Sequence, residues 1–251
     1  MTAILGVFWD VDRTPSRTIA RRMLEAMRWR GGEREAVWAR DGALLAITRP
    51  DWECDDDLAG ATLVAEADGV VAVTDAALYY RADLRQALAR RGVVPLDTGP
   101  AALVLAAYQA WGDDCAARLE GDFAFVIWNP STRRVVPARD FAGKRTLFLA
   151  EFGGTLVIAS SIGGVLAHPE CPQEIDLAEV AAAAGGLFGA PFESCYRAVR
   201  NLPARWTLSR EGGDRATFAR HWSPPPEATG SSVPSFDEAA AELRARLERA
   251  A

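Results

Sequence analysis

Short runs of β-branched and aromatic residues recur along most of the chain, and such runs predict β-strands. The eight predicted strands span residues 3–8, 43–48, 61–65, 69–74, 123–128, 134–136, 146–152 and 155–160. Turn-forming sequences separate several of them, including Asn129-Pro130-Ser131-Thr132 and Gly153-Gly154. Because short turns of this kind join antiparallel neighbours, we expect mainly antiparallel sheets.

Four segments have apolar residues three and four positions apart, which is the spacing of one face of a helix. They span residues 16–29, 82–91, 100–111 and 177–184. In the third, Leu103, Ala106, Ala107 and Ala110 would line a single face. Strands that outnumber helices in this way predict an α+β domain in which helices cover antiparallel sheets.

The pattern changes near the end of the chain. Residues 223–234 are rich in Pro, Ser and Gly and have no apolar periodicity, which predicts a linker. Ser235 and Glu238 then form a capping-box pattern, and an apolar stripe follows at helical spacing through Leu243 and Leu247. A helix over 235–251 with such a stripe needs a surface that buries it. We expect that it either folds back on the domain or opens a further one.

Composition restricts the class of protein and of partner. The 251 residues are 49% hydrophobic and 25% charged, which is typical of a soluble globular protein. A net charge of -6, without a clustered basic stripe, argues against a nucleic-acid partner. Four cysteines without a C-x-x-C pair and only two histidines predict no metal site. Since no stretch of 18 uncharged apolar residues and no basic leader occur, we expect no membrane association and a cytoplasmic location.

Five stretches of the sequence occur in the order found in one enzyme family. They read MTAILGVF at 1–8, MRWRG at 27–31, VTDAALYY at 73–80, LEGDFAF at 119–125 and ARDFAGKRTLF at 138–148. Together they resemble the class II glutamine amidotransferase domain that forms the N-terminal half of asparagine synthetases. The last two stretches are the most specific, and their signature positions are Gly121, Phe123, Phe125, Arg139, Asp140 and Gly143.

The resemblance implies a four-layer αββα sandwich of the N-terminal-nucleophile (Ntn) hydrolase type over residues 1–222. In relatives, a helix like 235–251 opens an ATP-dependent synthetase domain, whose S-G-G-x-D-S loop does not occur in this chain. The resemblance therefore implies no cofactor here, with ATP and Mg expected only in the absent synthetase domain. That domain or subunit is the expected partner, and a peptide or a small carboxylate is the expected substrate class.

The position that carries the catalytic Cys in the resembled glutaminases is Thr2 here. In those enzymes the residue after the initiator Met becomes N-terminal, and its own α-amino group activates the side chain. An N-terminal Thr with a free α-amino group can serve as a nucleophile in the same way as the Cys. The other positions of the site, however, also differ from those of the resembled enzymes. We therefore interpret Thr2 as a degenerate nucleophile position and as the first β-branched residue of a strand.

The oxyanion donors of the resembled enzymes are an Asn side chain and the next Gly backbone N–H, which correspond to Thr74 and Asp75. Thr offers one rotatable hydroxyl in place of a fixed amide, and the Asp75 carboxylate would repel a developing oxyanion. Loss of one such donor typically lowers the rate by about 100- to 1,000-fold. These altered oxyanion positions predict that hydrolysis is lost.

In the resembled family, an Arg and an Asp bind the α-carboxylate and α-amino groups of glutamine. Arg49 matches the Arg, whereas Pro100 stands at the Asp position. Pro is favoured in the first turn of a helix, because its missing N–H would have no partner there. The family's R-G-P-D loop reads RGGE at 30–33, so the substrate pocket is altered as well. By contrast, Arg139 and Asp140 are interpreted as a turn and a buried ion pair that serve the fold.

The signature residues that build the fold are retained, whereas the positions that correspond to catalytic and substrate-binding residues are altered. This combination favours one function over two others. The favoured function is a degenerate, non-hydrolysing glutaminase-like domain of an ATP-dependent amide ligase, like β-lactam synthetases or lasso peptide cyclases, which need no ammonia. One alternative is an active Ntn amidohydrolase that uses Thr2, on glutamine within an asparagine synthetase or on another amide. The other is a stand-alone interaction module that binds a peptide or protein by the terminal helix or a sheet edge.

Overall fold

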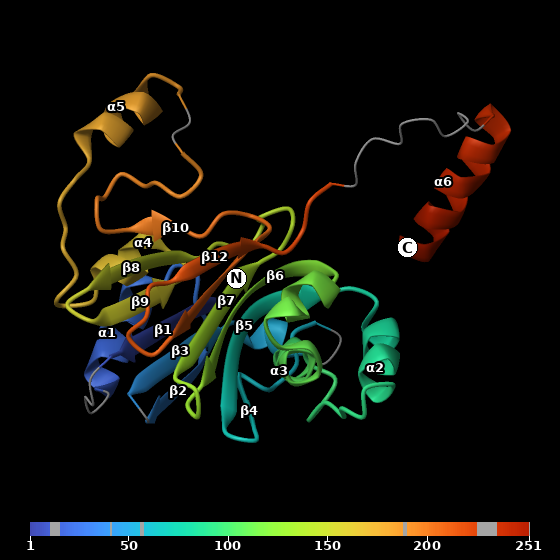
Figure 1. Cartoon of the computed structure of the whole chain (residues 1–251), viewed down its shortest axis with the longest axis horizontal. Coiled ribbons are helices and arrows are strands. Elements are labelled where there is room, and N and C mark those ends of the chain that lie inside the picture. Colours follow the sequence, from blue (N-terminus) through green and yellow to red (C-terminus); the bar gives the residue numbers. More distant parts are fainter. Residues whose placement is uncertain (11–15, 41, 56–57, 188–189, 225–234, 251) are drawn as a thin grey trace.

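Two six-stranded sheets lie face to face between two layers of helices (Figure 1). The computed structural model describes residues 1–10, 16–40, 42–55, 58–187, 190–224 and 235–250. Each sheet buries one face against the other sheet and its outer face against helices, which is a stable way to cover apolar surfaces on both sides. The predicted α+β class and the four-layer αββα arrangement of antiparallel sheets are confirmed.

Sheet A carries the N-terminal strand near its centre, with both neighbours antiparallel to it. In spatial order its strands are β10 (Arg200–Asn201), β8 (Phe148–Phe152), β9 (Thr155–Ala159), β1 (Ala3–Trp9), β3 (Ala43–Arg49) and β2 (Arg34–Arg40). Every residue of β1 and β3 is buried. Ala3 lies opposite Thr48 in the register, which places Thr2 at the same end of the sheet as Arg49.

Sheet B forms the second inner layer. In spatial order its strands are β12 (Thr217–Arg220), β11 (Trp206–Glu211), β7 (Arg134–Arg139), β6 (Gly121–Asn129), β5 (Val70–Leu78) and β4 (Val64–Ala67). The signature residue Gly121 begins β6 with φ +133°, and a Cβ added there would lie 2.3 Å from the Ala77 carbonyl oxygen. Because only Gly tolerates this conformation and this close approach, the position has a structural reason.

Helices cover the outer faces of both sheets. On sheet A lie α1 (Arg17–Ala26) and α4 (Ile162–Leu166), and on sheet B lie α2 (Arg81–Ala89) and α3 (Pro100–Trp111). The other helical elements are α5 (Leu177–Ala184), α6 (Phe236–Ala250) and the 3-10 turns η1 (Asp51–Cys54) and η2 (Gly112–Arg118). Within α3, all residues from Pro100 to Ala107 are buried. The prediction that only one face of this helix is buried is therefore wrong. Sheet B, α2 and η2 surround this helix, which explains why it is apolar all round.

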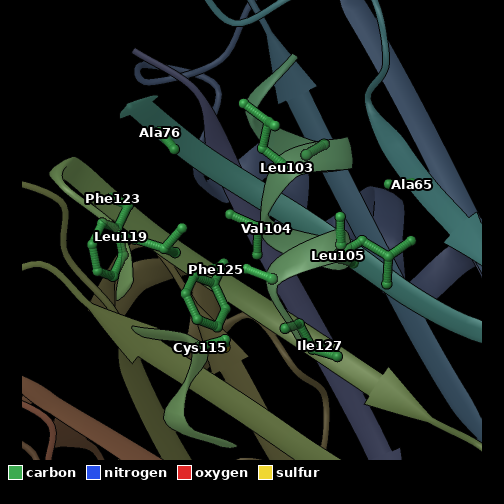
Figure 2. Close-up of a cluster of buried hydrophobic side chains, with 14 of the residues drawn as sticks. Ala65, Ala76, Leu103, Val104, Leu105, Cys115, Leu119, Phe123, Phe125 and Ile127 are labelled. Carbon is green, nitrogen blue, oxygen red and sulfur yellow. The ribbon is translucent and has the colours of Figure 1, made fainter. Parts of the chain in front are cut away.

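Side chains of β6 alternate between two cores. Phe123 and Phe125 face α3, whereas Ala124 faces sheet A. Figure 2 shows Leu103 and Val104 of α3 in the same cluster as these rings, whose centroids lie 5.7 Å apart. The two signature aromatics therefore belong to the packing between the sheet and its helical layer.

Several element boundaries differ from those predicted. The strand predicted at 61–65 is β4, three residues later, and the helix predicted at 16–29 ends at Ala26. The apolar pattern does not predict β2, β11 or β12, because charged and partly exposed residues interrupt their alternation. Strands at or near a sheet edge keep such residues because one side meets water.

The helix α6 lies apart from both sheets (Figure 1), and every side chain described in it is exposed. Its exposed residues include the apolar Phe236, Leu243 and Leu247. The predicted capping box at its start is confirmed by hydrogen bonds between Ser235 and Glu238. Residues 225–234 of the predicted linker lie outside the described residues, and the domain boundary after 222 stays a prediction.

We expect the backbone amides of α6 to exchange with solvent nearly as fast as those of an isolated peptide. A helix of 15 residues without tertiary contacts is marginal in water, so its hydrogen bonds open readily. Hydrogen–deuterium exchange with mass spectrometry on the full chain measures this, and the buried α3 serves as the protected internal control. Strong protection of α6 would show instead that the helix folds back on the domain.

Candidate functional site

Thr2 lies at the buried end of sheet A, directly before β1, with 1% of its surface exposed. Its hydroxyl donates to Glu53 Oε2 over 2.6 Å. The Met1 amine lies 3.3 Å from the other carboxylate oxygen of Glu53. Glu53, on the turn η1 that follows β3, therefore holds both the Thr2 hydroxyl and this amine.

Arg49, the last residue of β3, is completely buried. Its guanidinium donates to three backbone carbonyls in the segment 59–62, at 2.9 to 3.2 Å, and to the Thr74 carbonyl at 3.2 Å. Its Nε lies 3.4 Å from Thr2 Oγ1. Burial lowers the pKa of this guanidinium. Arg49 thus ties three segments together, and its donors are engaged within the chain.

Asp75, on β5, is 2% exposed and forms two ion pairs. Its carboxylate lies 3.0 Å from the Arg145 guanidinium and 3.4 Å from that of Arg30. Burial raises the pKa of Asp75 from its ordinary value of 3.8 to about 6, although both guanidiniums favour the charged form. A buried carboxylate held by two cations therefore lies at position 75, which the sequence predicts to be an altered oxyanion position.

Arg30 is fixed by a second contact as well. Its Nη1 donates to Thr146 Oγ1 over 3.3 Å, and this hydroxyl donates in turn to the Ser160 carbonyl over 2.7 Å. Thr146 belongs to the stretch ARDFAGKRTLF at 138–148, and the resembled family has Pro at its position. The departure from the signature therefore supplies a hydroxyl that helps to orient the cation beside Asp75.

Thr74 and Pro100 complete the predicted site positions. The Thr74 hydroxyl is buried without a hydrogen-bond partner, and strand alternation directs it away from the face that carries Asp75. Pro100 is the buried first residue of α3. A Cβ added at the preceding Gly99 would lie 3.4 Å from the Ala59 carbonyl, so α3 begins beside the segment that binds Arg49. The predicted positions gather in one region, where hydrogen bonds join Thr2, Arg49 and Thr74.

Arg139 and Asp140 build the loop that carries Arg145. The Asp140 carboxylate accepts hydrogen bonds from the backbone N–H groups of Phe123, Ala142, Lys144 and Arg145. The Arg139 guanidinium donates to the carbonyls of Gly143, Arg145 and Leu202 and to the Asn201 side chain. The predicted turn is therefore present, but the predicted ion pair between the two side chains is wrong. Each binds other groups because the loop between β7 and β8 presents many polar backbone atoms that need partners.

Sequence reasoning missed Glu53 and the roles of Arg30 and Arg145. Glu53 lies among several acidic residues at 51–57, and such a cluster is more typical of a solvated loop than of a buried site. Arg30 and Arg145 each lie in one of the five family-like stretches, but no spacing relates them to Asp75 along the chain. Only the folded arrangement of the turn after α1, the loop between β7 and β8 and strand β5 brings these charges together, so no simple sequence signal could have found them.

The arrangement sets limits on chemistry. An oxyanion needs fixed donors near the attacked carbonyl, whereas the side chain at position 75 is an acceptor already bound by two cations. Among the residues that the structure describes, no group of three or more His, Cys, Asp or Glu side chains could hold a metal ion. Within the same ranges, no helix is long and apolar enough to cross a bilayer.

Residues 1–222 match the sequence family described as glutamine amidotransferase domain. The chain is 26% identical over 235 residues to asparagine synthetase [glutamine-hydrolyzing] 3 of Bacillus subtilis, a match that covers 91% of this chain and 37% of that protein. It is 36% identical over 94 residues to a putative asparagine synthetase of Mycobacterium tuberculosis, covering 37% of this chain and 14% of that protein. The chain thus spans little more than a third of the first relative and less of the second.

Two solved structures share the fold at low sequence identity. The glutamine phosphoribosylpyrophosphate amidotransferase of B. subtilis, complexed with ADP and GMP, matches with a TM-score of 0.59 and 14% identity. A structure described as the allosteric regulatory enzyme of purine biosynthesis matches with a TM-score of 0.60 and 13% identity. Each match covers 88% of this chain and 49% of the other chain. At this identity the likeness shows the shared αββα fold alone.

Proposed function

Since the chain belongs to the class II glutamine amidotransferase domains of the asparagine synthetase family, we propose that it is a non-hydrolysing member of that family. Its retained role would be to provide the folded shell of an amide-forming ligase. The observation that carries this proposal is the buried Asp75 carboxylate, held by Arg30 and Arg145 at the position of an oxyanion donor.

The electrostatics of Asp75 support the proposal. A tetrahedral intermediate places a new negative charge on the former carbonyl oxygen, and glutaminases stabilise it with fixed donors. A carboxylate at this position adds repulsion where attraction is needed. Arg30 and Arg145 offset this repulsion only in part, because two guanidiniums and one carboxylate leave a net charge of +1 and both guanidiniums already bind the carboxylate.

The state of Thr2 and Arg49 supports it further. The Thr2 hydroxyl is held by Glu53, and its surroundings are closed to solvent. Arg49, which corresponds to the residue that binds the α-carboxylate of glutamine, uses its donors on backbone carbonyls of the chain itself. A glutamine molecule would have to displace these contacts before it could bind.

The partner in this proposal is an ATP-dependent domain or subunit of the asparagine synthetase type, which would supply the sites for ATP and Mg. The support is that the matched relatives are named asparagine synthetases and extend well beyond the matched region. A ligase of the β-lactam synthetase or lasso peptide cyclase type would fit best, because such ligases take an amine already present in a peptide or small carboxylate substrate. Cytoplasmic location is part of the same proposal.

We expect the protein to release no more ammonia from glutamine than its Thr2→Ala variant does. Coupled ammonia assays at pH 7 on both proteins measure this, and mass spectrometry establishes which residue is N-terminal in each sample. A glutamine-hydrolysing asparagine synthetase is the positive control. Ammonia release that Thr2→Ala abolishes would overturn the proposal.

That outcome would favour the second candidate, an active Ntn amidohydrolase. One contact speaks for it: the Thr2 hydroxyl lies 2.6 Å from Glu53 Oε2, a carboxylate that could accept its proton. Glu53→Gln distinguishes the two candidates, since it should abolish any Thr2-dependent activity and should change nothing in a non-hydrolysing domain.

A further inference from the structure

A hollow of about 210 Å³ opens between the start of α2 and the end of α3. Three aromatic residues, Tyr79, Tyr80 and Trp111, line it together with Leu84 and Ala87 of α2. The residues of the Thr2 region are not among those that line it. Its chemistry therefore has to be considered separately from the proposed function.

The polar groups at this hollow favour a positive ligand. Asp83 and Glu120 line it as acids, and Arg118 is the basic residue in the lining. The helix α3 ends here at Trp111 with no basic residue in its last turn, so its terminal carbonyls add partial negative charge. The hollow thus has aromatic walls and a net negative charge.

The backbone at the hollow is strained. Tyr80 has φ 48° and ψ 40°, the left-handed conformation, which bulky residues seldom adopt. Close to its neighbour Tyr79 lies the Asp122 carboxylate, which pairs with Lys144 at 3.2 Å. Burial and the negative charge of this carboxylate raise the pKa of the Tyr79 hydroxyl. Strain of this kind persists where surrounding contacts impose it and is often found at ligand-binding positions.

We propose that this hollow is a binding site for a small organic cation, an alkylated ammonium or a guanidinium head group. A volume of about 210 Å³ corresponds to roughly seven waters at about 30 Å³ each, enough for one such head group. It is smaller than the roughly 300 to 1,000 Å³ of pockets that enclose whole drug-sized ligands. The faces of Tyr and Trp rings attract cations, and nearby carboxylates reinforce this attraction. The cation can belong to a free amine or to a peptide side chain.

Isothermal titration of the full chain tests the site with three probes. Tetramethylammonium represents a free alkylated amine, capped arginine amide represents a peptide side chain, and tert-butanol is the neutral control of similar bulk. We expect one or both cations to bind with a dissociation constant on the order of millimolar. Tert-butanol should bind at least tenfold more weakly. The stronger of the two cations identifies the source of the head group.

Variants locate the binding. Tyr79→Ala should weaken cation binding roughly fivefold or more, and Asp83→Asn about threefold, while Tyr79→Phe keeps the ring and should bind nearly as well as the parent. The matched control is Phe141→Ala, because Phe141 and Tyr79 are both 49% exposed. Circular dichroism checks the folding of each variant, and the exposed Asp83→Asn carries the test if Tyr79→Ala misfolds. The proposal is overturned if neither cation binds, if tert-butanol binds equally, or if Tyr79→Ala and Asp83→Asn bind like Phe141→Ala.

Discussion

Replacing Arg49 by Met is expected to lower the free energy of unfolding by about 3–5 kcal/mol. The wild-type guanidinium satisfies four buried or half-buried carbonyls, three in the segment 59–62 and one at Thr74. Met fills a similar volume but donates no hydrogen bond. Each buried acceptor left without a partner costs about 1–3 kcal/mol, and only part of this is recovered by burying an apolar side chain.

Urea unfolding at pH 7, followed by circular dichroism, measures this change. Arg49→Lys is the matched control, because it keeps the charge but cannot reach carbonyls on separate segments with one ammonium group. We expect Arg49→Lys to fall between the wild type and Arg49→Met. A loss below about 1 kcal/mol in Arg49→Met would show that the carbonyls find other partners, and that Arg49 does not hold these segments together.

Asp75→Asn is expected to become more stable than the wild type as the pH rises from 4 to 7. The folded pKa of Asp75 is about 6, above its ordinary value of 3.8, so the folded state holds this proton more tightly than the unfolded state. A raised carboxyl pKa means that the wild type loses stability as the pH rises through this window. The difference of about two pKa units corresponds to about 3 kcal/mol at pH 7.

The amide of Asn resembles the protonated carboxyl in shape but does not titrate. At pH 4 the variant and the wild type should therefore be nearly equal in stability, and the gap should open between pH 4 and 6.5. Urea unfolding of both proteins at each pH gives the difference curve. Asp51→Asn is the control, since Asp51 is an exposed partner of Arg34 and reports the loss of a surface ion pair. A flat curve for Asp75→Asn, or one that falls with pH, would contradict the burial argument.

Both predictions concern charged side chains that are buried at the same end of the molecule. The Arg49 guanidinium is hydrogen-bonded to backbone carbonyls and the Asp75 carboxylate is paired with two guanidiniums, so both charged groups have partners within the chain. If Arg49→Met destabilises as expected, that residue serves the fold. A glutaminase in which the same Arg holds substrate would be expected to lose mainly substrate affinity.

Much of the fold follows from local patterns. The apolar runs, the turn at Gly153-Gly154 and the aromatic alternation at Phe123 and Phe125 predict buried antiparallel strands, and these are present. The sequence is less informative at β2 and β12, where charged residues hide the strand period. The sequence also predicts only one buried face for α3, whereas the helix is buried on all sides along most of its length. A pattern along one helix does not reveal how many neighbouring elements surround it.

The candidate site also has a part that the sequence identified and a part that it did not. The resemblance identified the five positions Thr2, Arg49, Thr74, Asp75 and Pro100, and the fold gathers them in one region. Their partners were not predictable, because Glu53, Arg30 and Arg145 come from three different loops. Contacts between loops depend on strand register and on burial, which no local spacing encodes.

The sequence alone therefore determined the layers of this protein and its family, since periodicity and motif order are properties of neighbouring residues. Only the tertiary structure decided which partners the candidate site residues contact. It places the Asp75 carboxylate in a buried ion-pair cluster with Arg30 and Arg145, and it shows that the Arg49 guanidinium binds carbonyls of two other segments. The physical reason is that the energy of a charge depends on its burial and on the partners that the folded chain brings within a few ångströms.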